Sequence, residues 1–409
     1  MTPEIKPNDV FRPGKIPVEQ NNVYSPRGDK EIDFKKFIDR GWVPVVYGEY
    51  GVGKTSLARH ILKEYSERST LVNVESVEGK NFEDVIQQVL ESLGYTVTKR
   101  LNVSQTTARS AEASSGAKSW IELNAKYSES QSKTVSREIE FAVKSPTESK
   151  VISAADAAGV ALILDELHKA SQEFKKSLTS FIKAYSNANC SNFKIVLLGT
   201  SSDASELVDL DEGIDRIVNE IRLPSMETSE SNFLIATGMR RLNIEIPMDI
   251  KESLIKFAVG SPNILQYLCL EMAEAAFERD GRLIRYGDLE KAVKDYVETK
   301  ENRLYRKYNS AIETTGPRKY RKLILRALSE SEDEYVTMDY ISSKVTSYIG
   351  TVVPGTSLSG PLRNLKSNEY GEILRDVNRP IGGRVYNLTT FRDPSMKAFI
   401  RMINQRGVI

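Results

Sequence analysis

The sequence has few of the side chains that build metal centres, disulfide scaffolds and thiol enzymes. Its 409 residues include two cysteines, Cys190 and Cys269, and two histidines, His60 and His168. Two cysteines and two histidines leave little for a zinc site, for a disulfide scaffold or for a nucleophile made of a cysteine and a histidine. We therefore expect none of these three kinds of site.

Long apolar runs and an excess of one charge are also lacking. No stretch approaches the roughly 18–20 apolar residues needed to cross a bilayer, and the N-terminus shows no signal-peptide core. We expect no membrane contact and, by default, a cytoplasmic location. The net charge is +1, from 57 Lys and Arg against 56 Asp and Glu, so affinity for a polyanion requires an uneven distribution of charge.

The composition is that of a globular chain with more than one domain, with 40% hydrophobic and 28% charged residues. Apolar runs of strand length alternate with helical patterns across residues 29–225. This alternation predicts an α/β domain with a parallel sheet and helices on both faces. The predicted strands lie at residues 43–47, 70–74, 159–164, 194–198 and 219–223.

The rest of the chain divides into segments of different character. Residues 1–28 are predicted to run extended, residues 226–300 show only helical patterns, and residues 301–317 form a charged helical connector to a further domain at 318–409. Residues 96–150 interrupt the α/β domain with two runs of alternating apolar residues. These runs indicate either an inserted pair of strands, which would be a possible site for a protein partner, or a disordered loop with chance alternation.

A complete phosphate-loop motif, G-x-x-x-x-G-K-[ST], follows the first predicted strand. Its residues, with the serine that follows them, are Gly48, Glu49, Tyr50, Gly51, Val52, Gly53, Lys54, Thr55 and Ser56. Glycines let backbone N–H groups wrap a phosphate, and the start of the next helix adds positive potential. We expect Lys54 to reach the β- and γ-phosphates and Thr55 to bind Mg²⁺; the alternative is a glycine turn that binds nothing.

The predicted strand at 159–164 ends in two acids, Asp165 and Glu166, about 110 residues after the loop. Asp165 is placed to hold Mg²⁺ through water and Glu166 to polarise the attacking water, which favours ATP hydrolysis over binding alone. The alternative is an ordinary strand end with solvated acids. After the next predicted strand, Thr200 or Ser201 is expected to sense the γ-phosphate, or else to cap the following helix.

Five segments together resemble the AAA+ superfamily, and within it the clade of origin-recognition-type initiators and STAND switch ATPases. They read GEYGVGKTS, VALILDE, IVLLGTSS, IDRIVNEIRLPSM and VGSPNILQYL, and the resemblance covers about residues 20–300. It implies an AAA+ P-loop sheet domain, a helical lid at 226–300, ATP or ADP with Mg²⁺ at their junction, and a homo-oligomer that assembles through the nucleotide.

The resemblance assigns roles to three more residues. Arg27 belongs to the segment that borders the adenine. Arg216 is similar to the arginine that completes a neighbouring subunit's site, with Arg222 or a surface ion pair as alternatives. Pro262 fits the Gly-x-Pro pattern of STAND lids, which stands where initiators carry a sensing arginine and favours a slow switch; a plain helix break is the alternative.

The C-terminal segment, residues 318–409, shows the order helix, helix–turn–helix and hairpin, which resembles a winged-helix domain. It holds 15 Lys and Arg against 9 Asp and Glu, the local excess that DNA contact requires. Arg363 and Lys366 are predicted to face the major groove, and Arg375, Arg379 and Arg384 to touch phosphates or the minor groove.

Two functions therefore stay open. One is an ATP-hydrolysing machine whose partner is double-stranded DNA. The other is a STAND-type signalling or scaffold ATPase, in which the winged helix is an internal lock and the partner is a protein. Kinase-type transfer to a small molecule uses the same loop but is typical of compact single domains.

Overall fold

The computed structural model describes residues 5–15, 22–65, 71–75, 82–92, 148–199, 209–279, 281–313, 320–381 and 384–406. The chain divides into two compact units. The sheet unit comprises Arg27–Gly48 and Lys54–Leu223, and the helical unit comprises Met1–Pro26, Glu49–Gly53 and Pro224–Ile409. Among the described residues, no helix is both long enough and apolar enough to cross a membrane.

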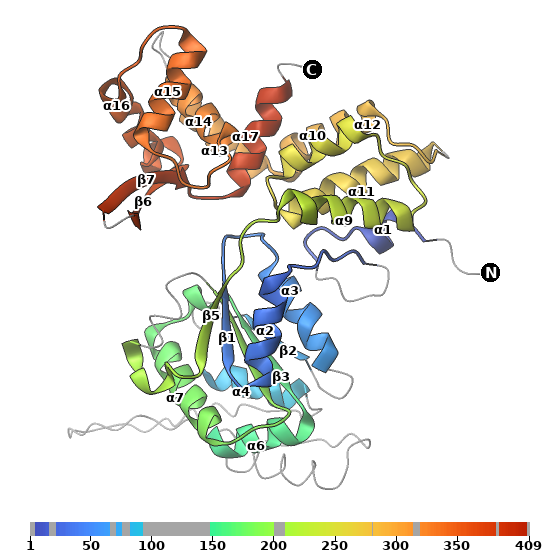
Figure 1. Ribbon diagram of the computed structural model, residues 1–409, viewed down its shortest axis with the longest axis vertical. Coiled ribbons are helices and arrows are strands. Elements are labelled where there is room, and N and C mark those ends of the chain that lie inside the picture. The colour runs from blue at the N-terminus through green and yellow to red at the C-terminus, as the bar shows by residue number, and fades with distance from the viewer. Residues whose placement is uncertain are drawn as a thin grey trace, which may run out of the picture. The chain divides into compact units, whose positions relative to one another are not determined.

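The sheet unit is built on five parallel strands in the order β2-β3-β4-β1-β5 (Figure 1). The strands are β1 (Val43–Tyr47), β2 (Leu71–Glu75), β3 (Ala161–Asp165), β4 (Lys194–Gly199) and β5 (Val218–Arg222). Because β1 and β3 flank β4 and all three run parallel, the carboxyl ends of β1 and β3 lie at one edge of the sheet. Ligands of open α/β sheets bind at this edge.

Helices cover both faces of the sheet. On one side are α2 (Asp29–Asp39) and α3 (Lys54–Leu62), and on the other are α4 (Phe82–Ser92), α6 (Glu148–Ala158) and α7 (Gln172–Asn187). Val45 belongs to the core under α4, α6 and α7, whereas its neighbour Val46 is buried outside that core. Burial of alternate side chains on opposite faces explains the unbroken apolar run of β1 and confirms the predicted fold class. Short helical turns complete the unit at η1 (Lys63–Tyr65), η2 (Leu167–Lys169) and η3 (Glu212–Ile214).

The helical unit begins with the N-terminal segment and the four helices that follow the sheet. We call these four the lid helices: α9 (Thr228–Arg241), α10 (Met248–Ala258), α11 (Pro262–Glu278) and α12 (Tyr286–Asp295). The N-terminal segment contains a short helix, α1 (Pro7–Val10), that the sequence did not predict, and it packs on the lid helices. The backbone N–H of Arg12 donates to Gln266 Oε1 at 2.9 Å, and that of Gly14 donates to Asn263 Oδ1 at 2.6 Å.

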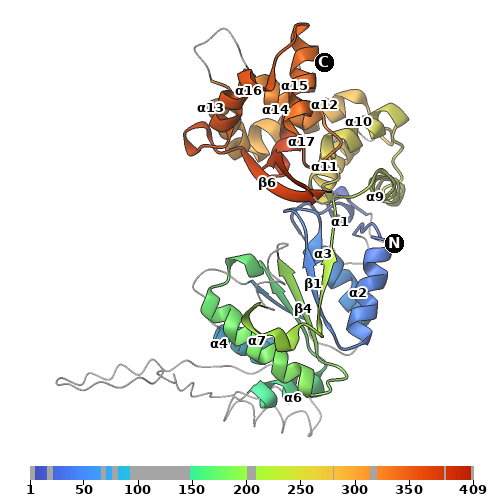
Figure 2. The same cartoon turned by 60° about the vertical axis from the view of Figure 1, so that its left-hand side comes forward.

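A π-helix, η4 (Tyr296–Lys300), and α13 (Asn302–Ile312) lead to the C-terminal domain, which we define as residues 320–406. Figure 2 shows its helices and hairpin from a second direction. Its elements are α14 (Tyr320–Glu330), α15 (Met338–Ile349), α16 (Gly355–Leu365), η5 (Asn368–Tyr370), the antiparallel pair β6 (Leu374–Ile381) and β7 (Arg384–Phe391), and α17 (Ser395–Arg406). The Thr337 side chain caps α15 by accepting from Tyr340 N.

One hydrophobic core runs through the whole helical unit. It includes Phe11 of the N-terminal segment, Leu254 of α10, Leu325 of α14 and Phe399 of α17. Helix α10 packs directly against α17. The N-terminal segment, the lid helices and the C-terminal domain are therefore one folded body.

The structure describes only the end of the segment at residues 96–150. The last three residues of this segment belong to α6, which the sequence patterns did not predict. The two alternating runs fall within residues 93–147, which lie outside the described residues. The inserted pair of strands and its protein partner therefore stay predictions.

Candidate nucleotide-binding site

The phosphate loop, residues 48–55, connects β1 to α3. Gly51 and Gly53 have φ angles of +83° and +97°, in the region that side chains with a Cβ rarely adopt. Helix α3 begins at Lys54, so the N–H groups of its first turn, which the helix's own hydrogen bonds do not use, lie at the loop. This is the backbone geometry that binds phosphate at a helix N-terminus.

The start of α11 lies beside the glycines of the loop. A Cβ on Gly51 would lie 3.6 Å from Ser261 Oγ, and one on Gly53 would lie 3.5 Å from Pro262 Cγ. Ser261 also caps α11 by accepting from Ile264 N at 3.4 Å, and Pro262 is the first residue of the helix. Pro262 thus starts a helix and also lies next to the phosphate loop.

Three polar residues meet at the carboxyl edge of the sheet. Lys54 Nζ donates to the Gly48 carbonyl oxygen at 2.8 Å. Thr55 Oγ1 donates to Asp165 Oδ2 at 2.6 Å, and Asp165 Oδ1 accepts from the backbone N–H of Glu166 at 2.8 Å. The hydroxyl of the motif and the carboxylate at the end of β3 are therefore adjacent.

Glu166 has an unusual backbone conformation for a side chain with a Cβ. Its φ and ψ are 59° and 39°, in the left-handed region, and it directly precedes η2. Strain of this kind is concentrated at functional sites. Its half-buried carboxylate forms an ion pair with Lys169.

The remaining residues predicted around the nucleotide are placed as follows. Ser56 is half-buried in the first turn of α3. Arg27 is 6% exposed, and its backbone N–H donates to Glu31 Oε1 at 2.8 Å, just before α2. Thr200 directly follows β4 and lies outside the described residues.

The predicted arginine for a neighbouring subunit, Arg216, lies between η3 and β5 on the surface of the sheet unit. Its side chain is exposed, and its Nη2 donates to Ser186 Oγ at 3.4 Å. The rival arginine, Arg222, is the last residue of β5 and is also exposed.

The residues predicted to touch DNA lie on α16, directly after it, and on the hairpin. Arg363 is exposed on α16, but Lys366 forms an ion pair with Asp376 at 2.5 Å. Arg375 is exposed on β6. Arg379 belongs to β6 and Arg384 is the first residue of β7, and both are close to the hairpin tip. Their side chains lie outside the described part of the chain. Sequence patterns showed the basic residues, but not the carboxylate that pairs with Lys366.

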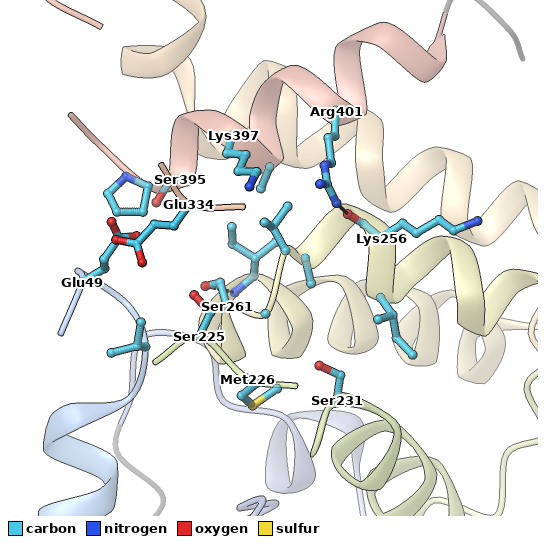
Figure 3. A pocket seen from close by; sticks show the side chains of 18 of the residues that line it. Glu49, Ser225, Met226, Ser231, Lys256, Ser261, Glu334, Ser395, Lys397 and Arg401 are labelled. Carbon is cyan, nitrogen blue, oxygen red and sulfur yellow. Dashed lines mark hydrogen bonds between the residues drawn. The ribbon is translucent and has the colours of Figure 1, made fainter. Parts of the chain in front are cut away.

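A cavity of about 600 Å³ lies within the helical unit, next to the tip of the phosphate loop (Figure 3). Its wall includes Glu49 and Tyr50 of the loop, Ser261 of α11, Glu334 of the C-terminal domain and Lys397 of α17. Burial and then a hydrogen bond with Glu334 raise the pKa of Glu49 to about 8. Burial lowers the pKa of Lys397 to about 8. The motif predicted Glu49 as a loop residue, but it gave no signal of this partner.

The comparisons with known proteins concern the family and the fold. Residues 40–208 match the family model described as AAA domain. No curated protein matches the sequence. The sheet unit thus carries the sequence pattern of an AAA domain around its phosphate loop.

Two solved structures are similar to this chain in fold. A Walker-type ATPase of Pyrococcus abyssi is 16% identical with a TM-score of 0.51, and the match covers 95% of this chain and 98% of that chain. The ORC2 protein of Aeropyrum pernix, solved as ADPNP–ADP complexes, is 13% identical with a TM-score of 0.50, and the match covers 98% and 100%. The chain therefore has the AAA+ fold.

Proposed function

We propose that the protein binds ATP with Mg²⁺ at the phosphate loop and hydrolyses it. The observation that carries this proposal is the hydrogen bond between Thr55 and Asp165, which joins the motif to the acid at the end of β3. The Thr55 hydroxyl is a hard oxygen ligand that suits Mg²⁺, and the Asp165 carboxylate would hold the ion through water, with further waters and phosphate oxygens completing its coordination. When bound, the ion would neutralise charge on the phosphates. The match of residues 40–208 to the AAA domain supports the same function.

The roles of the neighbouring side chains follow from their positions. Lys54 now donates to Gly48 O, and it would turn from this carbonyl to the β- and γ-phosphates. Glu166 would orient the attacking water once its carboxylate leaves Lys169. Arg27 near the base and Thr200 near the γ-phosphate complete the proposed site.

Two substitutions separate binding from hydrolysis. Lys54→Ala should abolish nucleotide binding in calorimetry, whereas the exposed Lys176→Ala on α7 should leave it intact. Glu166→Gln should retain binding but lower the hydrolysis rate about 10²–10⁴-fold, the usual contribution of a general base. The exposed Glu173→Gln is its matched control. Normal turnover by Glu166→Gln would contradict the role of Glu166, and binding by Lys54→Ala would contradict the site.

For the C-terminal domain we propose a winged helix that engages double-stranded DNA. The order of α14, α15, α16 and the β6–β7 hairpin supports it, as does the excess of Lys and Arg over Asp and Glu in residues 318–409. Exposed Arg363 on α16 is the residue best placed for a groove contact. Lys366 would have to exchange Asp376 for a phosphate, which weakens its contribution.

A salt-titrated duplex-binding assay on the full chain tests this proposal. Arg363→Ala should weaken binding, whereas Arg240→Ala, an exposed arginine of α9 outside the C-terminal domain, should not. Absence of duplex binding at low salt would remove the DNA function.

The second candidate, a switch that signals to a protein, is favoured by one observation. Glu334 of the C-terminal domain is hydrogen-bonded to Glu49 of the phosphate loop, as an internal lock requires. In this function the partner binds at residues 96–150, and binding of a protein by the full chain without duplex DNA would support it. Both functions include assembly into a homo-oligomer through the nucleotide, which mass measurement with a slowly hydrolysed ATP analogue tests.

A further inference from the structure

Two acidic side chains meet beside the phosphate loop. Glu49 is the second residue of the loop, and Glu334 lies between α14 and α15 in the C-terminal domain. Their carboxyl groups are hydrogen-bonded to each other, both side chains are half-buried, and Figure 3 shows them side by side. Two carboxylates have no hydrogen to donate, so a hydrogen bond between them needs one proton.

The charged groups around this pair come from two further elements of the C-terminal domain. Lys397 from α17 and Arg375 from β6 both lie close enough for their charges to lower the pKa of Glu49. Burial and the partner carboxyl outweigh these cations, because the pKa of Glu49 still lies at about 8. The pair therefore keeps its proton at neutral pH.

The other charged residues on the cavity wall come from α10, α17 and the segment just before Glu334. Arg401 of α17 donates to the carbonyl oxygens of Lys256 and Ser331, at 3.2 and 2.9 Å. Glu332 lies 3.7 Å from Arg401 Nη2 and is 95% exposed. Neither Glu332 nor Arg401 is among the groups that shift the pKa of Glu49. Glu252 and Lys256 of α10 also line the wall, and they too are absent from those groups.

We propose that Glu49 and Glu334 share one proton, and that this proton couples the phosphate loop to the C-terminal domain. The inference rests on the proposed function, because Glu49 belongs to the loop that would hold the triphosphate. An anion in the loop stabilises the protonated form of Glu49 and thus its contact with Glu334. By reciprocity, the contact with the C-terminal domain strengthens anion binding at the loop.

The coupling depends on pH with a defined sign. In the contact Glu49 keeps its proton up to about pH 8, whereas an ordinary glutamate loses it near pH 4.5. The contact binds more protons than the separated groups in this range, so it weakens as the pH rises from 4.5 to 8. Lys397 loses its charge in the same upper range, which leaves Arg375 as the charged group that still favours the ionised form of Glu49.

The first test is a titration of the full chain with ¹³C in the glutamate side-chain carboxyl groups, followed by NMR. The wild type should show one glutamate that titrates near pH 8. This resonance should be absent in Glu49→Gln, should move toward 4.5 in Glu334→Gln, and should stay in Glu332→Gln, the exposed control. If every glutamate titrates in the ordinary range, the shared proton is overturned, whether or not nucleotide binds.

The second test measures the coupling itself. Calorimetry of MgADP binding in buffers of different ionisation enthalpy gives the number of protons taken up. Uptake just below pH 8 should be larger in the wild type and in Glu332→Gln than in Glu49→Gln and Glu334→Gln. Equal uptake in all four proteins would overturn the coupling. A wild type that binds no nucleotide would instead overturn the proposed function, and the NMR titration would still decide on the pair.

Discussion

The ring of Phe11 fills the space next to Gly238. A Cβ on Gly238 would lie 2.3 Å from Phe11 Cζ and 2.4 Å from Cε1, closer than atoms can approach. Gly238 lies inside α9, where a glycine costs about 0.5–1 kcal/mol relative to alanine. This glycine is therefore explained by the docking of the N-terminal segment and not by the helix.

Gly238→Ala should destabilise the helical unit. Overpacking a filled core costs about 1–3 kcal/mol, which outweighs the gain of up to about 1 kcal/mol in helix propensity. The measurement is the free energy of unfolding in denaturant. The control is Gly287→Ala in α12, where no atom lies within 4 Å of the added Cβ and a small stabilisation is expected. Equal effects of both substitutions would show that Phe11 does not pack against α9 as described.

Asp165→Asn should weaken magnesium-dependent nucleotide binding. The amide keeps the shape and the hydrogen bond with Thr55 but removes the negative charge. If Asp165 holds the ion through water, the loss in metal affinity should be about 10–100-fold. A Mg²⁺ titration of ADP binding by calorimetry measures it, with exposed Asp249→Asn in α10 as the control. An unchanged Mg²⁺ dependence would rule out this role for Asp165.

Asp288 should stabilise the lid helices except in acid. Burial alone would raise the pKa of Asp288, but hydrogen bonds from Arg279 Nη2 at 2.9 Å and Arg285 N at 2.8 Å outweigh it and hold the pKa below its ordinary value. A lowered pKa adds stability above the ordinary pKa of about 3.9, and this stability is lost as the pH falls through the folded value.

Asp288→Asn tests this expectation. At neutral pH the variant should lose about 1.5–3 kcal/mol of the free energy of unfolding, the range for hydrogen bonds to charged groups. The difference from the wild type should shrink in acid, when the wild-type carboxylate is protonated as well. A difference independent of pH would mean that the charge of Asp288 contributes nothing.

Arg216→Ala should lower ATP hydrolysis and leave nucleotide binding unchanged, if Arg216 acts on a neighbouring subunit. An arginine supplied to another site accelerates hydrolysis about 10³–10⁵-fold in P-loop enzymes. A mixture of Arg216→Ala and Lys54→Ala chains should regain activity that neither has alone, because the second supplies Arg216 to the first. Rates measured on the mixture decide the point, with Arg240→Ala as the control. An inactive mixture would favour Arg222 or a structural role for Arg216.

Local patterns predicted the elements that present a regular apolar face. The predicted limits of β1, residues 43–47, agree with the structure because this strand is an unbroken apolar run of strand length. Helix α6 was missed because its buried side chains include the small Ala154 and Ala155 and it starts inside a Ser- and Thr-rich stretch. Helix α17 was missed although Met396, Phe399 and Ile400 have helical spacing, so the signal was present there.

The candidate site was predictable where chemistry is carried by neighbouring residues. The phosphate loop is continuous in sequence, and the acids at 165 and 166 directly follow an apolar strand. Contacts between distant segments leave no such pattern. Two such contacts depend on how the helical unit packs. One is the contact between the carboxyl groups of Glu334 and Glu49, and the other is the position of Pro262 beside Gly53.

Because the helical unit has one continuous core, the stability of its C-terminal domain depends on the packing of its N-terminal segment. Phe11 of the N-terminal segment and Phe399 of α17 belong to the same apolar core, which also holds the buried face of α16, the helix that carries Arg363. Deleting the N-terminal segment would uncover apolar surface on α9 and α11. If the C-terminal domain binds duplex DNA as proposed, the truncated protein should bind it more weakly although Arg363 is unchanged.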